Sequence, residues 1–161
     1  MNTKRFNCFI DTLPVAQGRP RFARRGKFVN TYDPKKSKDY KKLVAFEVRR
    51  FMQEGKVPVF SGAISLRLSF YFPRIKGKYG IYKETRPDCS NLAKGVEDAL
   101  NGILWEDDSR IVVLSMEKRY TDEKEMRTGV LIEVMEVCNE IPINMQGILR
   151  RKAVLDFDQL T

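Results

Sequence analysis

Residues 64–72 read ISLRLSFYF, and this stretch decides the kind of fold that the chain can form. Aliphatic or phenylalanine side chains take every second position, and serine, arginine or tyrosine stands between them. Such alternation is typical of a strand with one buried face, so we expect a half-buried strand here. Residues 5–13 also alternate, and the β-rich runs 110–120 and 129–137 flank the polar turn TDEKEMRTG. The last two runs therefore predict an antiparallel hairpin.

Two helices are predicted between these strands. After a loop over residues 14–33 that is rich in Gly, Pro, Arg and Lys, Asp33 resembles an N-cap and Pro34 a first helical residue. Apolar residues then recur at helical spacing to about residue 54, at Tyr40, Leu43, Val44, Val48, Phe51 and Met52. A second helix is predicted from about Asp88 to Leu104. The order strand, helix, strand, helix, strand, strand predicts a single mixed sheet of the α/β (α+β) class, with the helices packed on it.

The length of 161 residues suits one domain with a hydrophobic core. We expect this domain over residues 1–138, followed by an extension, 139–161, that docks, exchanges between protomers or stays loose. No apolar run approaches the ~20 residues that cross a bilayer, and the N-terminus lacks the apolar core of a signal peptide. A cytoplasmic protein without membrane contact is therefore expected. Cys8, Cys89 and Cys138 form no CxxC pair, which argues against a disulfide framework or a cysteine zinc site.

The composition narrows the chemistry. Thirty Lys and Arg against 21 Asp and Glu give a formal net charge of +9, which favours a polyanionic partner, although a generic basic surface would give the same count. The chain contains no histidine, and this absence excludes Ser-His-Asp and Cys-His catalysis and histidine-ligated metals. Carboxylates, lysines or a bound metal would have to carry any catalysis.

Cations and aromatic residues gather in two segments. The first comprises Arg19, Arg21, Phe22, Arg24, Arg25, Lys27, Phe28, Lys35, Lys36, Lys38, Lys41 and Lys42. The second comprises Lys76, Lys78, Tyr79, Tyr82, Lys83 and Arg86. One interpretation is contact with DNA phosphates, with Phe22 stacking or wedging at a branch point. The other is a solvated basic face with Phe22 in the core.

Residues 86–111, RPDCSNLAKGVEDALNGILWEDDSRI, carry the candidate chemistry. On a helix, Asn91, Lys94 and Asp98 fall within about 60° of one another on a polar stripe. Asp88 stands at the helix start, where a carboxylate would satisfy free N–H groups. Without further information, Asp88 could be a plain N-cap, and Lys94 and Asp98 a solvated ion pair.

The acidic run Glu106-Asp107-Asp108 argues for more than a cap and an ion pair. These residues are predicted to end the second helix, where acids oppose the helix dipole and gain nothing locally. A bound cation would compensate them. Asp88 and Asp108 meet at such a cation only if the tertiary fold brings them together.

These motifs, in this order, resemble the RusA family of Holliday-junction resolvases. The family signature is roughly [KR]-P-D-x-D-N-L-x-K, then D-A-L-N-G, then D-D-[SA]-[QR]-[IV]-V. This chain matches it at Arg86–Lys94, Asp98–Gly102 and Asp107–Val112. Gly18–Phe22 and Tyr32–Lys36 resemble the phage-type branch of the family, which indicates a phage or prophage origin.

The resemblance implies a homodimeric, Mg²⁺-dependent endodeoxyribonuclease that resolves Holliday junctions or other branched DNA by paired phosphodiester cleavage, in recombination and repair. It implies that Asp88 and Asp108 are catalytic metal ligands, that Lys94 is the catalytic lysine, and that Asp98 and Asp107 support them. Mn²⁺ would be a substitute for Mg²⁺, and no small-molecule cofactor is expected. Carboxylate-held Mg²⁺ suits this reaction, because it neutralises phosphate charge and acidifies water.

The chain departs from the signature at Ser90, where the family usually has a second aspartate. Either Asn91, Asp98 or Asp107 completes the metal site with or without Ser90, or metal affinity and turnover are reduced. An alternative function is therefore a catalytically weakened accessory protein that binds branched nucleic acid. A small-molecule phosphotransferase is disfavoured, because no glycine-rich phosphate loop is present.

Overall fold

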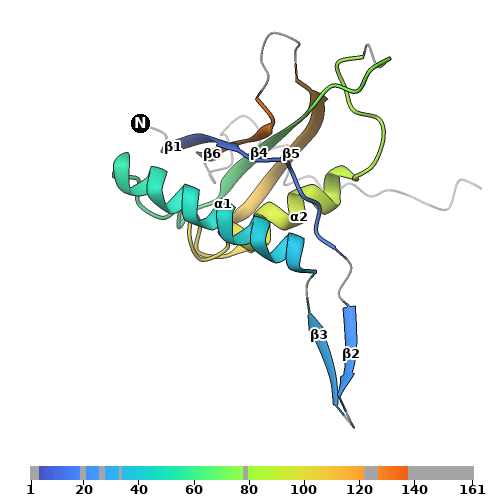
Figure 1. The fold of residues 1–161 in the computed structure, drawn as a ribbon. Coiled ribbons are helices and arrows are strands. Elements are labelled where there is room, and N and C mark those ends of the chain that lie inside the picture. The colour runs from blue at the N-terminus through green and yellow to red at the C-terminus, as the bar shows by residue number, and fades with distance from the viewer. Residues whose placement is uncertain are drawn as a thin grey trace, which may run out of the picture.

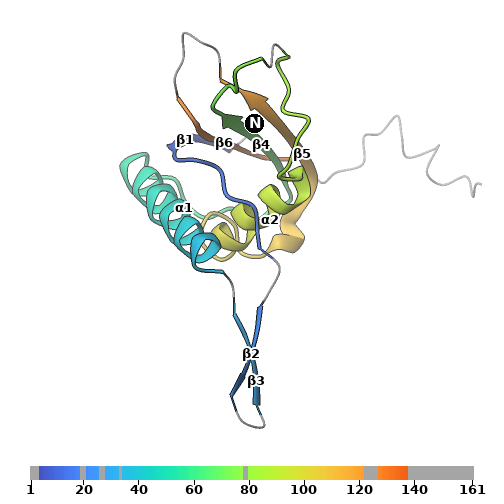
Figure 2. The ribbon, with the colours of Figure 1, turned by 45° about the vertical axis from the view of Figure 1, so that its right-hand side comes forward.

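The computed structural model describes residues 4–18, 21–25, 28–32, 34–77, 80–121 and 127–137, with the main chain alone for 21–25 and 28–32. A four-stranded mixed sheet has the strand order β1-β6-β4-β5. Two helices lie side by side on one face of this sheet (Figures 1 and 2). The elements are β1 (Arg5–Asp11), α1 (Lys35–Glu54), β4 (Ile64–Phe72), α2 (Cys89–Leu100), β5 (Ile111–Tyr120) and β6 (Gly129–Glu136). This arrangement confirms the predicted class and the predicted order of helices and sheet strands.

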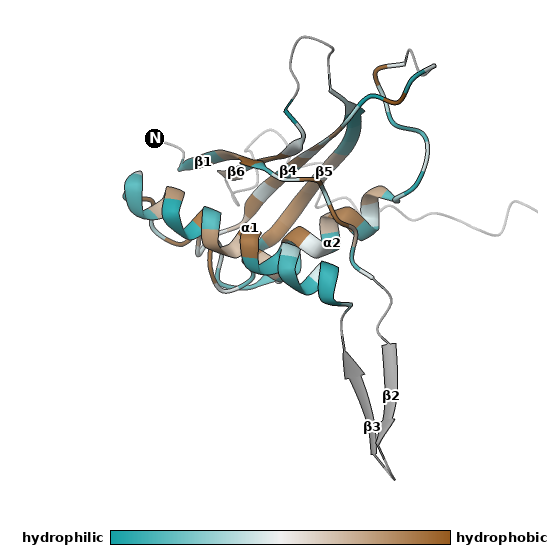
Figure 3. Ribbon diagram, in the orientation of Figure 1, coloured by the Kyte–Doolittle hydropathy of each residue, from teal (hydrophilic) through white to brown (hydrophobic). Residues whose placement is uncertain are grey.

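The core forms where the sheet meets the helices. The alternating residues of β4 that were predicted to be buried are at most 6% exposed: Ile64, Leu66, Leu68, Phe70 and Phe72. Val44 and Val48 of α1 and Leu92 and Val96 of α2 are fully buried against this layer. Figure 3 shows the same division, with brown apolar stretches along the strands and teal polar stretches on the outer turns of α1. Burying this apolar surface is the main force that holds the helices on the sheet.

The predicted hairpin of 110–120 with 129–137 is wrong, because β4 lies between the two strands. β5 runs parallel to β4, whereas β6 runs antiparallel to it. The most apolar strand thereby gains hydrogen-bonded neighbours on both edges, which also explains why β4 is more buried than the expected half. The connection over residues 121–128 is long enough to cross two strand spacings, about 10 Å.

The cation-rich segment predicted as a loop instead contains a second, two-stranded sheet. β2 (Arg21–Arg25) and β3 (Phe28–Tyr32) pair antiparallel, with Arg21 opposite Tyr32. We call this hairpin the arm, since it projects away from the sheet and the helices (Figure 1).

The helix boundaries were partly predicted. α1 ends at Glu54 as expected, but its N-cap position is Pro34, and Asp33 lies outside the described residues. α2 ends at Leu100 rather than Leu104, because Gly102 adopts φ 72° and turns the chain out of the helix.

Two expectations concern the remainder of the chain. Among the described residues, none of the helices has the length and apolarity that a membrane span requires. The predicted extension, 139–161, lies outside the described residues.

Candidate active site

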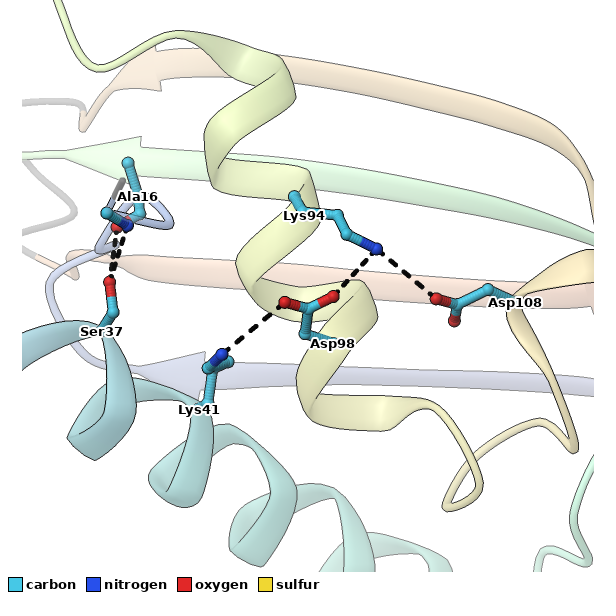
Figure 4. A network of polar contacts seen from close by, with 7 residues as sticks. Ala16, Ser37, Lys41, Lys94, Asp98 and Asp108 are labelled. Atoms are coloured by element: carbon cyan, nitrogen blue, oxygen red, sulfur yellow. Dashed lines mark hydrogen bonds and ion pairs between the residues drawn. The ribbon is translucent and has the colours of Figure 1, made fainter. Parts of the chain in front are cut away.

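A polar network on the exposed face of α2 joins three elements (Figure 4). The Lys94 ammonium lies 2.9 Å from Oδ1 of Asp98, one turn along the same helix, and 3.7 Å from Oδ2 of Asp108. Lys41 of α1 reaches the other oxygen of Asp98 at 3.6 Å. Lys94 and Asp98 are therefore more than the solvated pair that their spacing allows, because a carboxylate from a distant loop and a lysine from a second helix join them.

The network concentrates negative charge around one cation. The hydrogen bond that the Lys94 ammonium donates to Asp98 raises the pKa of Lys94, and the charge of Asp108 acts in the same direction, so Lys94 stays protonated. Burial raises the pKa of Glu97; Lys94 opposes this shift, and the charges of Asp108 and Asp98 add to it. Sequence reasoning missed Glu97, although it stands directly before Asp98.

The acidic run does not end α2, so the expectation that nothing local compensates it was wrong. The run leads into a short 3₁₀ turn, η1 (Asp108–Arg110). Glu106 pairs with Arg110 at 3.1 Å, and Oδ1 of Asp107 accepts a 2.9 Å hydrogen bond from the Ser109 N–H. Hydrogen bonding to the side chain of Ser109, and then to its N–H, lowers the pKa of Asp107. Glu106 and Asp107 therefore have partners in or next to the same short turn.

The two carboxylate oxygens of Asp108 lie in different environments. Oδ1 accepts a 2.9 Å hydrogen bond from the indole N–H of Trp105, a side chain that is 0% exposed. Oδ2 faces Lys94. One oxygen is thus held from the protein interior, and the other points to the exposed lysine.

Asp88 occupies the N-cap position of α2, but its side chain makes no capping hydrogen bond. The plain-cap interpretation therefore fails, and the exposed carboxylate remains available for a ligand. Asp88 lies six positions before Lys94, which corresponds to about 9 Å along the helix axis. The loop before Asp88 is fixed by Lys118 of β5, whose ammonium donates to the carbonyls of Thr85 and Pro87 at 2.7 Å each.

The donor chemistry suits a hard cation. Within the described ranges, no three Asp, Glu or Cys side chains are grouped closely enough to hold a metal ion. Mg²⁺ in phosphate-processing sites commonly uses only one or two carboxylates and takes its remaining ligands from phosphate and water. Asp98 and Asp108 meet that requirement, because both already converge on the ammonium of Lys94. Ser90 and Asn91 are exposed on the first turn of α2, toward Asp88.

The predicted DNA-binding residues fall into three groups. Arg21, Phe22, Arg24 and Arg25 lie on β2, and their side chains are outside the description, as are Arg19, Lys27 and Lys78 entirely. Exposed positions are held by Lys35 and Lys36 in the first turn of α1, and by Lys76 and Arg86 in the loop before α2. Lys41, also among the predicted cations, belongs to the acidic network.

Residues 16–18 precede the arm, and we call them its root. They are hydrogen-bonded to both helices beside this network. The Gly18 N–H donates to Oγ of Ser37 at 2.9 Å, and that hydroxyl donates to the Ala16 carbonyl at 3.0 Å. The Gln17 N–H donates to the main-chain carbonyl of Asn91 at 2.7 Å. The root of the arm is thus bonded to both helices, and Figure 4 places its contact with Ser37 near the Lys41–Asp98 contact.

Comparison with known proteins shows similarity over most of the chain. The family model for the endodeoxyribonuclease RusA matches residues 11–134, which include the arm, both helices and the acidic network. The uncharacterized protein YqaN of Bacillus subtilis (strain 168) is 36% identical over 122 residues, which cover 68% of this chain and 84% of that protein.

Proposed function

Because this chain belongs to the RusA endodeoxyribonuclease family, we propose that it is a Mg²⁺-dependent endonuclease that resolves Holliday junctions and other branched DNA by paired phosphodiester cleavage. The observation that carries the proposal is the convergence of Asp98 and Asp108 on Lys94 beside the root of a cationic arm. Fixed carboxylates with a lysine between them are the groups that phosphodiester hydrolysis requires in a chain without histidine.

The carboxylates of the network and Lys94 have different roles in this reaction. Asp108 and Asp98, with Asp88 from the helix start, would hold Mg²⁺ or its substitute Mn²⁺. The ion, when bound, supplies charge neutralisation at the phosphate and a more acidic water. Lys94 is held charged by its acidic neighbours, so it donates hydrogen bonds to the phosphate oxygens as negative charge develops on them.

The cations outside the network would bind the DNA backbone. Arg21, Arg24 and Arg25 lie on the projecting arm, and Lys35 and Lys36 begin the helix that follows it. Phosphate contacts fix the position of a duplex without reading its sequence, which suits an enzyme that recognises a branch. Phe22 in the same strand would stack on bases that the branch leaves unpaired.

Paired cleavage requires two active sites, and we propose a homodimer formed through β5. This strand is the edge of the sheet, and its residues Val112, Val113 and Leu114 are 58%, 50% and 40% exposed. Among the described residues, the main chain of the loop at 81–83 bonds to the far end of the strand, at Lys118 and Tyr120. An exposed apolar edge strand is an aggregation hazard unless a partner covers it, and a second copy pairs with it symmetrically.

A weakened, DNA-binding accessory protein is the second candidate. It is favoured by Ser90 and by the lack of a three-acid group in the part of the chain that the structure describes. This candidate keeps the cationic arm and predicts junction binding without cleavage.

The test is cleavage of a labelled four-way junction with and without Mg²⁺, by the native protein and by Asp108→Asn and Glu106→Gln. Asparagine keeps an oxygen for the Trp105 hydrogen bond but removes the charge facing Lys94. Glu106→Gln removes the same charge two residues away, where the carboxylate pairs with Arg110. We expect Mg²⁺-dependent cleavage by the native protein and by Glu106→Gln, and binding without cleavage by Asp108→Asn.

Two results would contradict the proposal. Native-rate cleavage by Asp108→Asn would remove this residue from the site. Junction binding by the native protein with no cleavage in Mg²⁺ or Mn²⁺ would favour the accessory protein.

A further inference from the structure

We propose that Trp105 is a positioning residue that fixes the Asp108 carboxylate in the orientation required for metal binding. The inference rests on the proposed function, because it assigns Asp108 to the metal. Trp105 itself touches neither metal nor DNA, since its side chain is wholly buried. Its contribution passes through a single hydrogen bond, 2.9 Å from the indole N–H to Oδ1 of Asp108.

Hydrogen bonds hold the main chain on both sides of Trp105, and the indole is packed in the core. The Gly102 N–H donates to the Trp105 carbonyl at 2.9 Å, and the Glu106 N–H donates to the Phe60 carbonyl at 3.1 Å. The Phe60 N–H in turn donates to the Leu104 carbonyl at 2.9 Å, and Phe60 is also fully buried. A donor on such a support has little freedom to follow its acceptor. The indole therefore constrains the carboxylate, rather than the reverse.

The hydrogen bond also determines which oxygen of Asp108 faces the network. Oδ1 is engaged by Trp105, so Oδ2 is directed toward Lys94 at 3.7 Å and toward the position where a cation would be shared with Asp98. Asp108 lies outside the core in a short 3₁₀ turn, and without the indole its carboxylate would lose its anchor to the core and keep the longer contact with the exposed Lys94. Residues that orient metal ligands commonly change metal affinity or activity by about 10–100-fold when they are replaced.

A purely structural interpretation is that Asp108 merely satisfies a buried indole donor. Trp105→Phe separates the two interpretations, because phenylalanine keeps an aromatic ring in the core and has no N–H to satisfy. If Trp105 positions Asp108, we expect the Mn²⁺ affinity of the DNA-free protein, measured by calorimetry, to fall by about 10-fold or more. We expect kcat for the junction to fall as well, with KM little changed. Unchanged Mn²⁺ affinity and kcat in a folded Phe variant would overturn the inference.

A second measurement needs no substitution at Trp105. Trp105 is the single tryptophan of the chain, so its fluorescence reports on this position alone. Paramagnetic Mn²⁺ bound at Asp108 should quench the native emission, and excess Mg²⁺ should reverse the quenching. Asp108→Asn should lose the quenching, whereas Glu106→Gln should retain it. Native protein that binds Mn²⁺ by calorimetry with no change in emission would also overturn the inference.

The two proposals fail in different ways. Native protein that cleaves junctions while the Phe variant matches it in metal affinity and rate leaves the endonuclease standing and removes the role of Trp105. Native protein that never cleaves, yet binds Mn²⁺ more tightly than the Phe variant, removes the endonuclease and supports the positioning role.

Discussion

Asp108 illustrates how much of a candidate site depends on a single residue that connects the core to the solvent. Its two oxygens have different partners, a buried indole and an exposed ammonium. The spacing of Lys94 and Asp98 predicted their contact, because residues four apart on a helix are neighbours. The approach of Asp108 to Lys94 was implied only by the family resemblance. The Trp105 bond was not predictable, because it depends on how residues 101–106 turn after the helix.

Ser90 provides a prediction at the residue scale. Ser90→Asp would add a carboxylate on the exposed first turn of α2, close to Asp88. We expect cleavage to reach half its maximal rate at a lower Mg²⁺ concentration, because Mg²⁺ prefers anionic oxygen ligands. Mn²⁺ should stimulate the native protein more than the variant. Gln53→Glu, which adds the same charge near the C-terminal end of α1, should leave the Mg²⁺ titration unchanged. Superimposable curves for the native protein and Ser90→Asp would show that position 90 does not face the metal.

Cys8 provides a second, independent prediction. Its thiol is buried on β1, and burial, with the nearby charge of Glu47, raises its pKa to about 12. The folded protein keeps this thiol neutral, whereas an unfolded thiol ionises from about pH 8.5 upward. Its contribution to stability is therefore complete below that pH and is lost as the pH rises toward 12. At pH 8, iodoacetamide should modify Cys89, which is partly exposed, and spare Cys8 until urea is added. Mass spectrometry of the peptides checks this, and rapid labelling of Cys8 in the native protein would contradict the buried position of β1.

At the scale of elements, the sequence predicted what is local and missed what depends on pairing. The spacing of apolar residues in β4, α1 and α2 can be read from consecutive residues, so these elements could be predicted directly from the sequence. Nothing in the composition of β5 and β6 says that β4 lies between them, and short turns favour the hairpin that was wrongly predicted. The strands of the arm are only five residues long, and three of the five residues of β2 are arginines, so the pattern of this segment resembles a loop.

The arm provides the prediction at this scale. Replacing Arg21, Arg24 and Arg25 with alanine should weaken junction binding and reduce the slope of log affinity against log salt by up to about three, one for each lost phosphate contact. The control replaces three exposed cations elsewhere, Arg5, Arg49 and Lys56, with alanine. Both variants lose the same net charge, so a difference between their slopes reports contacts and not overall charge. Equal slopes for the two variants would show that the arm is a solvated face.

At the scale of the whole molecule, the anchors of the arm and the acidic network meet on α2. The main-chain carbonyl of Asn91 accepts a hydrogen bond from Gln17 in the root of the arm, and Lys94 and Asp98 follow on the same helix. The family resemblance supplied the motifs on this helix, but not the fact that the root of the arm is bonded to it. DNA held by the arm would therefore lie against the same rigid element that carries the carboxylates, which suits precise positioning of a phosphate.

The dimer provides the last prediction. Val113→Lys places a charge at the centre of the exposed edge of β5, where half of the native side chain already meets solvent, so the cost to the folded monomer is small. If two copies pair through this edge, the charge is buried without a partner, and the dimer should dissociate to the 18.7 kDa monomer in sedimentation experiments. A monomer carries one site, so junctions should be nicked singly and no longer resolved by paired cuts. Phe46→Lys is the matched control, because Phe46 is 62% exposed on α1, and this helix contacts β1, the strand at the opposite edge of the sheet from β5. Dissociation by Phe46→Lys with a stable Val113→Lys dimer would move the interface from β5 to the helix, and a native protein that sediments as a monomer at assay concentrations would remove the dimer altogether.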